Sequence, residues 1–201
     1  MRIISISNQK GGVGKTTTTV NLAASLALSK KKVLLIDLDP QGNATSGAGI
    51  NKTGLISSIY DALIEQKTIN EVVLHSEDGL FDVAAANQSL AGAEVELVGI
   101  KNREFILKKA IEGLTVKYDY ILIDCPPALN LLTVNALVAS DSVLIPMQCE
   151  YYALEGLSDL VNTIRRVKKN LNPNIEIEGL LRTLFDKRNT LTKQVSDQLS
   201  A

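Results

Sequence analysis

The segment from residue 10 to residue 17 constrains the fold more than any other stretch of this chain. It reads KGGVGKTT, follows an apolar run at residues 3–6, and precedes a pattern that predicts a helix over residues 17–29. A strand, a glycine turn and a helix in this order form an anion cradle, because the first helical turn has unpaired N–H groups and a positive dipole end. Glycines also let the backbone approach an anion closely. The segment therefore predicts a phosphate-binding loop in an α/β fold.

Single residues of this loop have expected roles. The ammonium group of Lys15 would contact the β- and γ-phosphates of a nucleotide, and the hydroxyl of Thr16 would bind Mg²⁺. The backbone amides expected to surround the phosphates are those of Gly11, Gly12, Val13, Gly14, Lys15, Thr16 and Thr17. The alternative is a chance glycine-rich turn, which the presence of strand, turn and helix in the required order disfavours. The general pattern also has a glycine where this chain has Gln9, and Lys10 follows it.

Two other apolar runs end in acidic residues. Residues 33–36 precede Asp37 and Asp39, and residues 120–123 precede Asp124. Because the carboxyl ends of parallel strands meet at one edge of a sheet, these acids are expected near the phosphate loop. Asp124 would hold Mg²⁺ through a water molecule. The alternative for the first two acids is a pair of solvated carboxylates in a turn.

Hydrophobic patterning predicts the fold class. Apolar runs predict further strands over residues 79–85, 142–146 and 175–184, and helical spacing predicts helices over residues 55–64, 104–116, 130–139 and 157–169. Small and polar residues at 44–54 predict a flexible loop, and a last helix is expected from residue 190 to residue 201. The chain is therefore expected to be α/β, with a mostly parallel twisted sheet and helices on both faces. No repeat or linker appears, so residues 1–201 are expected to form a single domain.

Composition narrows the functional classes. The net charge is −1 and aromatic residues make up 4%, which argues against binding nucleic acid through overall charge or base stacking. The two cysteines, Cys125 and Cys149, have no metal-ligand or disulfide spacing. No signal peptide and no apolar run of about 20 residues is visible, so a cytoplasmic protein without a membrane span is expected.

The loop with its additional Lys10 resembles the deviant Walker A motif of the ParA/MinD group of P-loop ATPases. The stretches DLDPQGN at residues 37–43 and QCEYYALEG at residues 148–156 are similar to the ParA/Soj branch in particular. The resemblance covers essentially all 201 residues, whereas full ParA proteins continue for several dozen more. It therefore implies a P-loop ATPase domain that lacks the C-terminal part of the family fold.

The resemblance also implies a slow, Mg²⁺-dependent ATPase that forms a homodimer on binding ATP. Lys10 would reach a phosphate in the partner subunit, and Lys15 would neutralise charge on the transferred phosphoryl group. Asp39 would orient the attacking water and take part in the Mg²⁺ site, with Asp37 supporting it. The segment that ends in Asp186 would lie beside the adenine.

The implied role is chromosome or plasmid partitioning, with the ATP dimer bound nonspecifically to DNA on the nucleoid and stimulated by a ParB-type centromere-binding protein. Four basic residues near the end of the helix at 157–169 fit two interpretations, since they would complement the negative end of the helix dipole or contact DNA phosphates. They are Arg165, Arg166, Lys168 and Lys169.

Three rival functions are distinguishable. A MinD-like, membrane-associated division-site regulator needs a C-terminal amphipathic helix, which this chain does not reach. A metabolic ligase with the same loop type would lack Lys10 and would show a substrate pocket. A binding module with an inactive site is disfavoured because Lys15, Thr16, Asp39 and Asp124 are all present.

Overall fold

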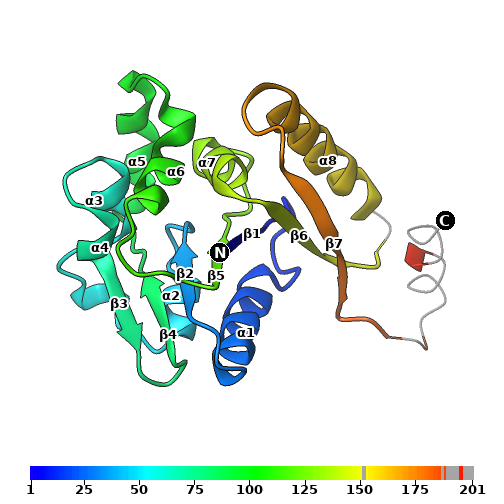
Figure 1. Ribbon diagram of the computed structural model, residues 1–201. Coiled ribbons are helices and arrows are strands. Elements are labelled where there is room, and N and C mark those ends of the chain that lie inside the picture. The colour runs from blue at the N-terminus through cyan, green and yellow to red at the C-terminus, as the bar shows by residue number, and fades with distance from the viewer. Residues whose placement is uncertain (151–152, 187, 189–194, 197–201) are drawn as a thin grey trace.

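The computed structural model in Figure 1 describes residues 1–150, 153–186, 188, 195 and 196. Within these residues, seven strands form one sheet in the order β3-β4-β2-β5-β1-β6-β7. The strands are β1 (Arg2–Ile6), β2 (Val33–Asp37), β3 (Val73–Ser76), β4 (Phe81–Ala84), β5 (Tyr120–Asp124), β6 (Ser142–Gln148) and β7 (Glu176–Thr183). Every pairing is parallel except that of β3 with β4, which is antiparallel. The predicted mostly parallel sheet is confirmed.

Helices cover both faces of this sheet (Figure 1). They are α1 (Lys15–Leu28), α2 (Asn43–Gly47), α3 (Ile59–Leu63), α4 (Ile69–Val72), α5 (Leu90–Glu96), α6 (Ile106–Glu112), α7 (Leu131–Ala139) and α8 (Ala153–Asn170). Side chains of successive residues in the central strands pack into hydrophobic clusters on opposite faces of the sheet, since side chains alternate along a strand. Leu34 and Ile36 pack with residues of α3 to α7, whereas Val33 and Leu35 pack with residues of α1 and α2. The expectation of helices on both faces is therefore also confirmed.

The end of the sheet beyond β1 is built by β6, β7 and α8. Leu160, Ile164 and Val167 form the predicted apolar stripe of α8 and pack in one cluster with residues of α7 and β6. Strand β7 is the outermost strand, and it exposes apolar side chains such as Ile177 and Leu181. Within the described residues, no helix combines the length and the apolar character that crossing a bilayer requires.

The prediction of a flexible loop over residues 44–54 is wrong. Helix α2 occupies the start of this stretch, and a 3₁₀ turn follows at Lys52–Gly54. Local propensity does not favour a helix of small and polar residues, so the helix depends on a tertiary contact: Thr45 is fully buried and bonded to Asp37. Strand β3 and helix α4 were not predicted either. The helix expected over residues 190–201 lies outside the described residues, apart from Val195 and Ser196.

Candidate nucleotide-binding site

Three neighbouring strands bring the predicted site residues to one edge of the sheet. Strand β5 lies between β2 and β1, and Asp124 pairs in register with Asp37 on one side and with Ile6 on the other. The loop after Ile6 therefore begins beside both carboxylates. Asp39 follows two residues after Asp37, and its N–H donates to Asp37 Oδ1 at 3.1 Å. The predicted gathering of acids at the phosphate loop is confirmed.

The loop has the backbone conformation that an anion cradle needs. Gly12 and Gly14 have φ angles of 73° and 85°, in the left-handed region where an L side chain would be strained. Gly14 is also the residue that precedes α1, so the loop leads directly into the amino end of that helix. In the described part of the chain, the amides of residues 11–14 have no hydrogen-bond acceptor. These amides are therefore free to donate to an anion, which fits a phosphate.

Lys15, Thr16 and Asp124 form the centre of the site. Lys15 is 8% exposed and its Nζ donates to Lys10 O at 3.1 Å. Burial lowers the pKa of Lys15, although the nearby Asp124 carboxylate opposes that shift. Thr16 Oγ1 donates to Asp124 Oδ2 at 2.8 Å, so a hydroxyl and a carboxylate lie together at the start of α1. An ammonium group held in a buried position beside free amides would attract a polyanion strongly.

Asp124 is fully buried, and burial raises its pKa to about 7, with the nearby Asp37 carboxylate adding to the shift. Thr19, which the sequence analysis did not identify, lies with its Oγ1 2.9 Å from Asp124 Oδ1. Its spacing of three residues from Thr16 was the available signal, because residues three apart share a helix face. Both oxygens of Asp124 are thus oriented by hydroxyl groups of α1.

Asp37 holds the segment that follows β2. Its Oδ2 accepts bonds from the N–H of Thr45 at 2.8 Å and from the Thr45 hydroxyl at 2.7 Å. The same hydroxyl accepts a bond from the N–H of Ala86 at 2.8 Å. Burial raises the pKa of Asp37 to about 6, and these hydrogen bonds oppose the shift. Asp37 therefore supports Asp39 and α2 by hydrogen bonds to their backbone.

Thr45→Val tests this support. The substitution keeps the shape of the side chain but leaves the buried Asp37 oxygen and the Ala86 N–H each without one partner. We expect a loss of about 2 kcal/mol in the free energy of unfolding, measured by urea denaturation. The matched control is Thr163→Val, because the Thr163 hydroxyl bonds only within α8, to Asp159 O. Equal stability of the two variants would contradict this role of Thr45.

Asp39 and Lys10 lie at the rim of the site. Asp39 is 9% exposed, and its Oδ1 accepts a bond from the N–H of Gln41 at 2.9 Å. The side chain of Lys10 is 37% exposed and forms an ion pair with Glu150 of the same chain. The ammonium group of Lys10 is therefore directed to the surface, whereas that of Lys15 is buried within the loop.

Asp186 is the one predicted site residue that the structure does not join to this cluster by a described contact. It follows the end of β7, and its carboxylate accepts hydrogen bonds from Arg188, which lower its pKa. The carboxylate is exposed to solvent. Its expected place beside an adenine remains a prediction.

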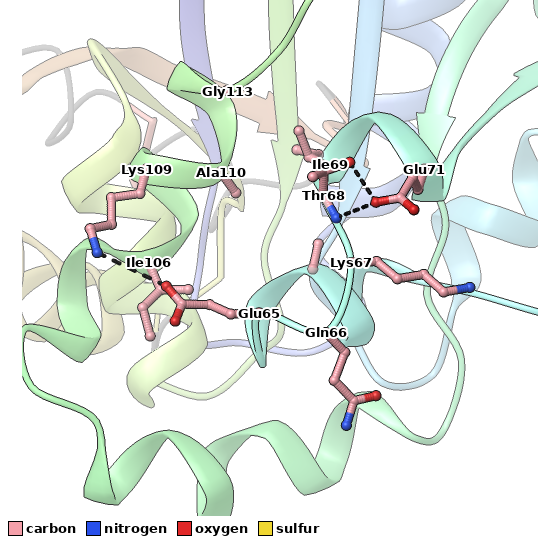
Figure 2. A pocket seen from close by; sticks show the side chains of 11 residues that line it. Glu65, Gln66, Lys67, Thr68, Ile69, Glu71, Ile106, Lys109, Ala110 and Gly113 are labelled. Atoms are coloured by element: carbon pink, nitrogen blue, oxygen red, sulfur yellow. Dashed lines mark hydrogen bonds and ion pairs between the residues drawn. The ribbon is translucent and has the colours of Figure 1, made fainter.

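A separate hollow of about 400 Å³ lies between α6 and the connection from α3 to α4, and Figure 2 shows the side chains that line it. Three of its four charged side chains are already partnered: Lys109 Nζ lies 4.0 Å from Glu65 Oε1, and Glu71 accepts bonds from the N–H and hydroxyl of Thr68. Its lining includes no residue that the sequence analysis assigned to the site. We therefore assign this hollow no part in nucleotide binding.

Known proteins are similar to this chain over the whole candidate nucleotide-binding site. The model of the AAA_31 family, described as an AAA domain, matches residues 1–177. The chain is 56% identical over 198 residues to the chromosome partitioning protein ParA of Myxococcus xanthus, a match that covers 98% of this chain and 70% of that protein. It is 55% identical over 198 residues to the sporulation initiation inhibitor protein Soj of Bacillus subtilis, covering 98% of this chain and 78% of that protein.

A solved structure is similar throughout this chain. The chain matches cobyrinic acid a,c-diamide synthase from Mycobacterium smegmatis with bound ATP analog and magnesium at a TM-score of 0.95 and 37% identity. This match covers 100% of the present chain and 82% of that one. The likeness in sequence and in backbone therefore includes every strand that contributes to the candidate site.

Proposed function

Because the chain belongs to the ParA/Soj family of chromosome-partitioning ATPases, we propose that it is a switch that binds ATP with Mg²⁺, dimerises, and hydrolyses the ATP slowly. The observation that carries this proposal is the separation of two lysines on one loop. Lys15 is buried inside the loop, and Lys10 extends from its rim. This separation supports a role for Lys15 at the nucleotide of its own subunit and for Lys10 at the nucleotide of a partner.

The residues present fit Mg²⁺. Thr16 and Asp124 would supply two neighbouring oxygens to hold the ion, and Mg²⁺ commonly takes few protein oxygens together with substrate phosphates and water. No cluster of three or more His, Cys, Asp or Glu side chains suited to a metal occurs in the described ranges, which agrees with a site completed by substrate. The ion would supply electrostatic stabilisation of the charge that develops on the phosphates.

Each side chain of the site has a defined task. Lys15 and the amides of residues 11–17 bind the phosphates, and Lys15 neutralises charge on the group being transferred. Asp39 orients the attacking water through its carboxylate. Within the described residues, no histidine contacts Asp39 to act as a general base, and we expect slow turnover, as suits a timer. The result of such a cycle is a change between monomer and dimer: bound ATP favours the dimer, and hydrolysis lets the two subunits separate.

Lys10→Ala tests the contribution across the dimer. A cation inserted by a partner can supply a large part of phosphoryl-transfer catalysis, so we expect hydrolysis to fall about 100-fold and the ATP-dependent dimer to be lost. ADP affinity should stay within about threefold, because Lys15 and the loop amides remain. The control is Glu150→Gln, which removes only the intramolecular partner of Lys10 and should retain hydrolysis. Wild-type dimerisation and hydrolysis in Lys10→Ala would disprove the assignment.

The proposed cellular role is partitioning of a chromosome or plasmid in the cytoplasm, with the ATP dimer bound to the nucleoid and stimulated by a ParB-type protein. The basic residues of α8 support nonspecific DNA contact, because all four are exposed near one end of the helix. Sizing in solution with ATP, with ADP and without nucleotide, each with and without DNA, tests this role. A monomer under all six conditions would contradict it.

An amide-forming ligase is the rival that the structural comparison raises. The higher identity to partition proteins and the position of Lys10 favour the switch. Phosphate release from ATP alone, increased by DNA together with a partition partner, would support the switch. Release that requires a carboxylic acid such as cobyrinic acid, together with an ammonia donor, would support the ligase.

A further inference from the structure

We propose that Thr183, at the end of β7, is a positioning residue for the phosphate loop. Thr183 Oγ1 donates a hydrogen bond to Val13 O at 2.8 Å, across 170 positions of sequence. Its methyl carbon also lies 3.6 Å from the position that a Cβ on Gly14 would occupy. The end of β7 therefore contacts the loop at the peptide group between Val13 and Gly14. This inference rests on the proposed binding of a nucleotide at that loop.

The need for such a contact follows from the geometry of an anion cradle. When successive N–H groups turn inward to a phosphate, the intervening carbonyl groups turn outward and require their own donors. Val13 O receives the Thr183 hydroxyl, and Gly12 O receives Gln148 Nε2 at 3.2 Å from the end of β6. Two consecutive carbonyls are thus fixed by neighbouring strands, while the amides of residues 11–14 have no acceptor in the described part of the chain.

The Thr183 contact is the stronger of the two. Its distance is shorter, it is partly buried, and a short β-branched side chain loses little freedom in making it. The Gln148 contact is exposed and uses a longer side chain. Because the Val13 peptide is held before any ligand arrives, nucleotide binding need not bear the entropy cost of ordering it. Thr183 should therefore contribute equally to ADP and to ATP affinity.

The test is Thr183→Val, which keeps the β-branched shape and strand propensity but removes the hydroxyl. We expect the Kd for Mg-ADP and for a nonhydrolysable Mg-ATP analogue to rise by a similar factor of about ten, equivalent to about 1.4 kcal/mol. The KM for ATP should rise with them and kcat should stay within twofold, since uniform binding is lost. Thr183→Ser should restore the wild-type Kd, and Thr163→Val on α8 should leave it unchanged.

The NMR order parameter of the Gly14 amide in nucleotide-free protein gives a second measurement, which does not depend on hydrolysis. In wild type it should be that of rigid backbone, about 0.85; Thr183→Val should lower it to below about 0.6, and Thr183→Ser should not. A Val variant with wild-type Kd would overturn the proposal, whatever its melting temperature, and so would a Ser variant as weak as the Val variant. If wild-type protein itself binds no nucleotide, the proposed function fails, whereas the order parameter of Gly14 still decides the role of Thr183.

Discussion

Lys15→Ala is expected to weaken binding of Mg-ADP and Mg-ATP at least about 100-fold, which corresponds to about 2.7 kcal/mol. Lys15 is 8% exposed, and within the described structure its ammonium group is the one that is buried in the loop. An ammonium in a site with little water interacts with phosphate much more strongly than a surface lysine would. Isothermal titration or a fluorescent nucleotide analogue measures the effect.

Loss of folding would not explain this result. Burial lowers the pKa of Lys15, so the charged form is held in the unliganded protein at a cost in stability. Removing the charge should leave the melting temperature unchanged or raise it. Lys15→Gln, which keeps length and polarity without charge, should bind as weakly as the Ala variant. The exposed Lys108→Ala on α6 serves as the control and should bind normally. Nucleotide affinity within threefold of wild type in Lys15→Ala would remove the basis of the site.

The parts of the site that could be predicted from sequence are those encoded by short, local patterns. The pattern of an apolar run followed by an acid predicted Asp37 and Asp124. Neighbouring parallel strands bring the acids at their carboxyl ends together. The glycine turn and Lys15 follow from the same kind of local pattern. These features need no knowledge of which distant residue contacts which.

The parts that could not be predicted depend on distant partners. Thr45 was assigned to a flexible loop because its neighbours are small and polar, yet its contacts with Asp37 and Ala86 hold α2 in place. Thr183 contacts Val13 only because β7 is added beside β6. Single threonines carry no pattern that indicates such pairings, and their hydroxyls find partners only after the sheet has formed.

The same distinction applies to Asp39, whose position follows from sequence but whose proposed catalytic role depends on the surrounding charges. Asp39→Ala is expected to reduce ATP hydrolysis at least about 100-fold, because the group proposed to orient the attacking water is lost. ATP affinity should be equal to or higher than that of wild type, since a carboxylate near the phosphates is removed while Lys15 and Thr16 remain. The ATP-dependent dimer should therefore persist and accumulate.

A change in loop structure is the alternative explanation, and Asp39→Asn separates it from the chemical one. Asp39 Oδ1 accepts a bond from the N–H of Gln41, and an asparagine oxygen can make the same bond. If the carboxylate acts on water, the Asn variant should lose hydrolysis as the Ala variant does while keeping ATP binding. Asp78→Asn, on the exposed turn between β3 and β4, is the matched control. Steady-state phosphate release and sizing with ATP measure both effects, and an Asn variant that hydrolyses ATP within threefold of wild type would show that the carboxylate only shapes the turn.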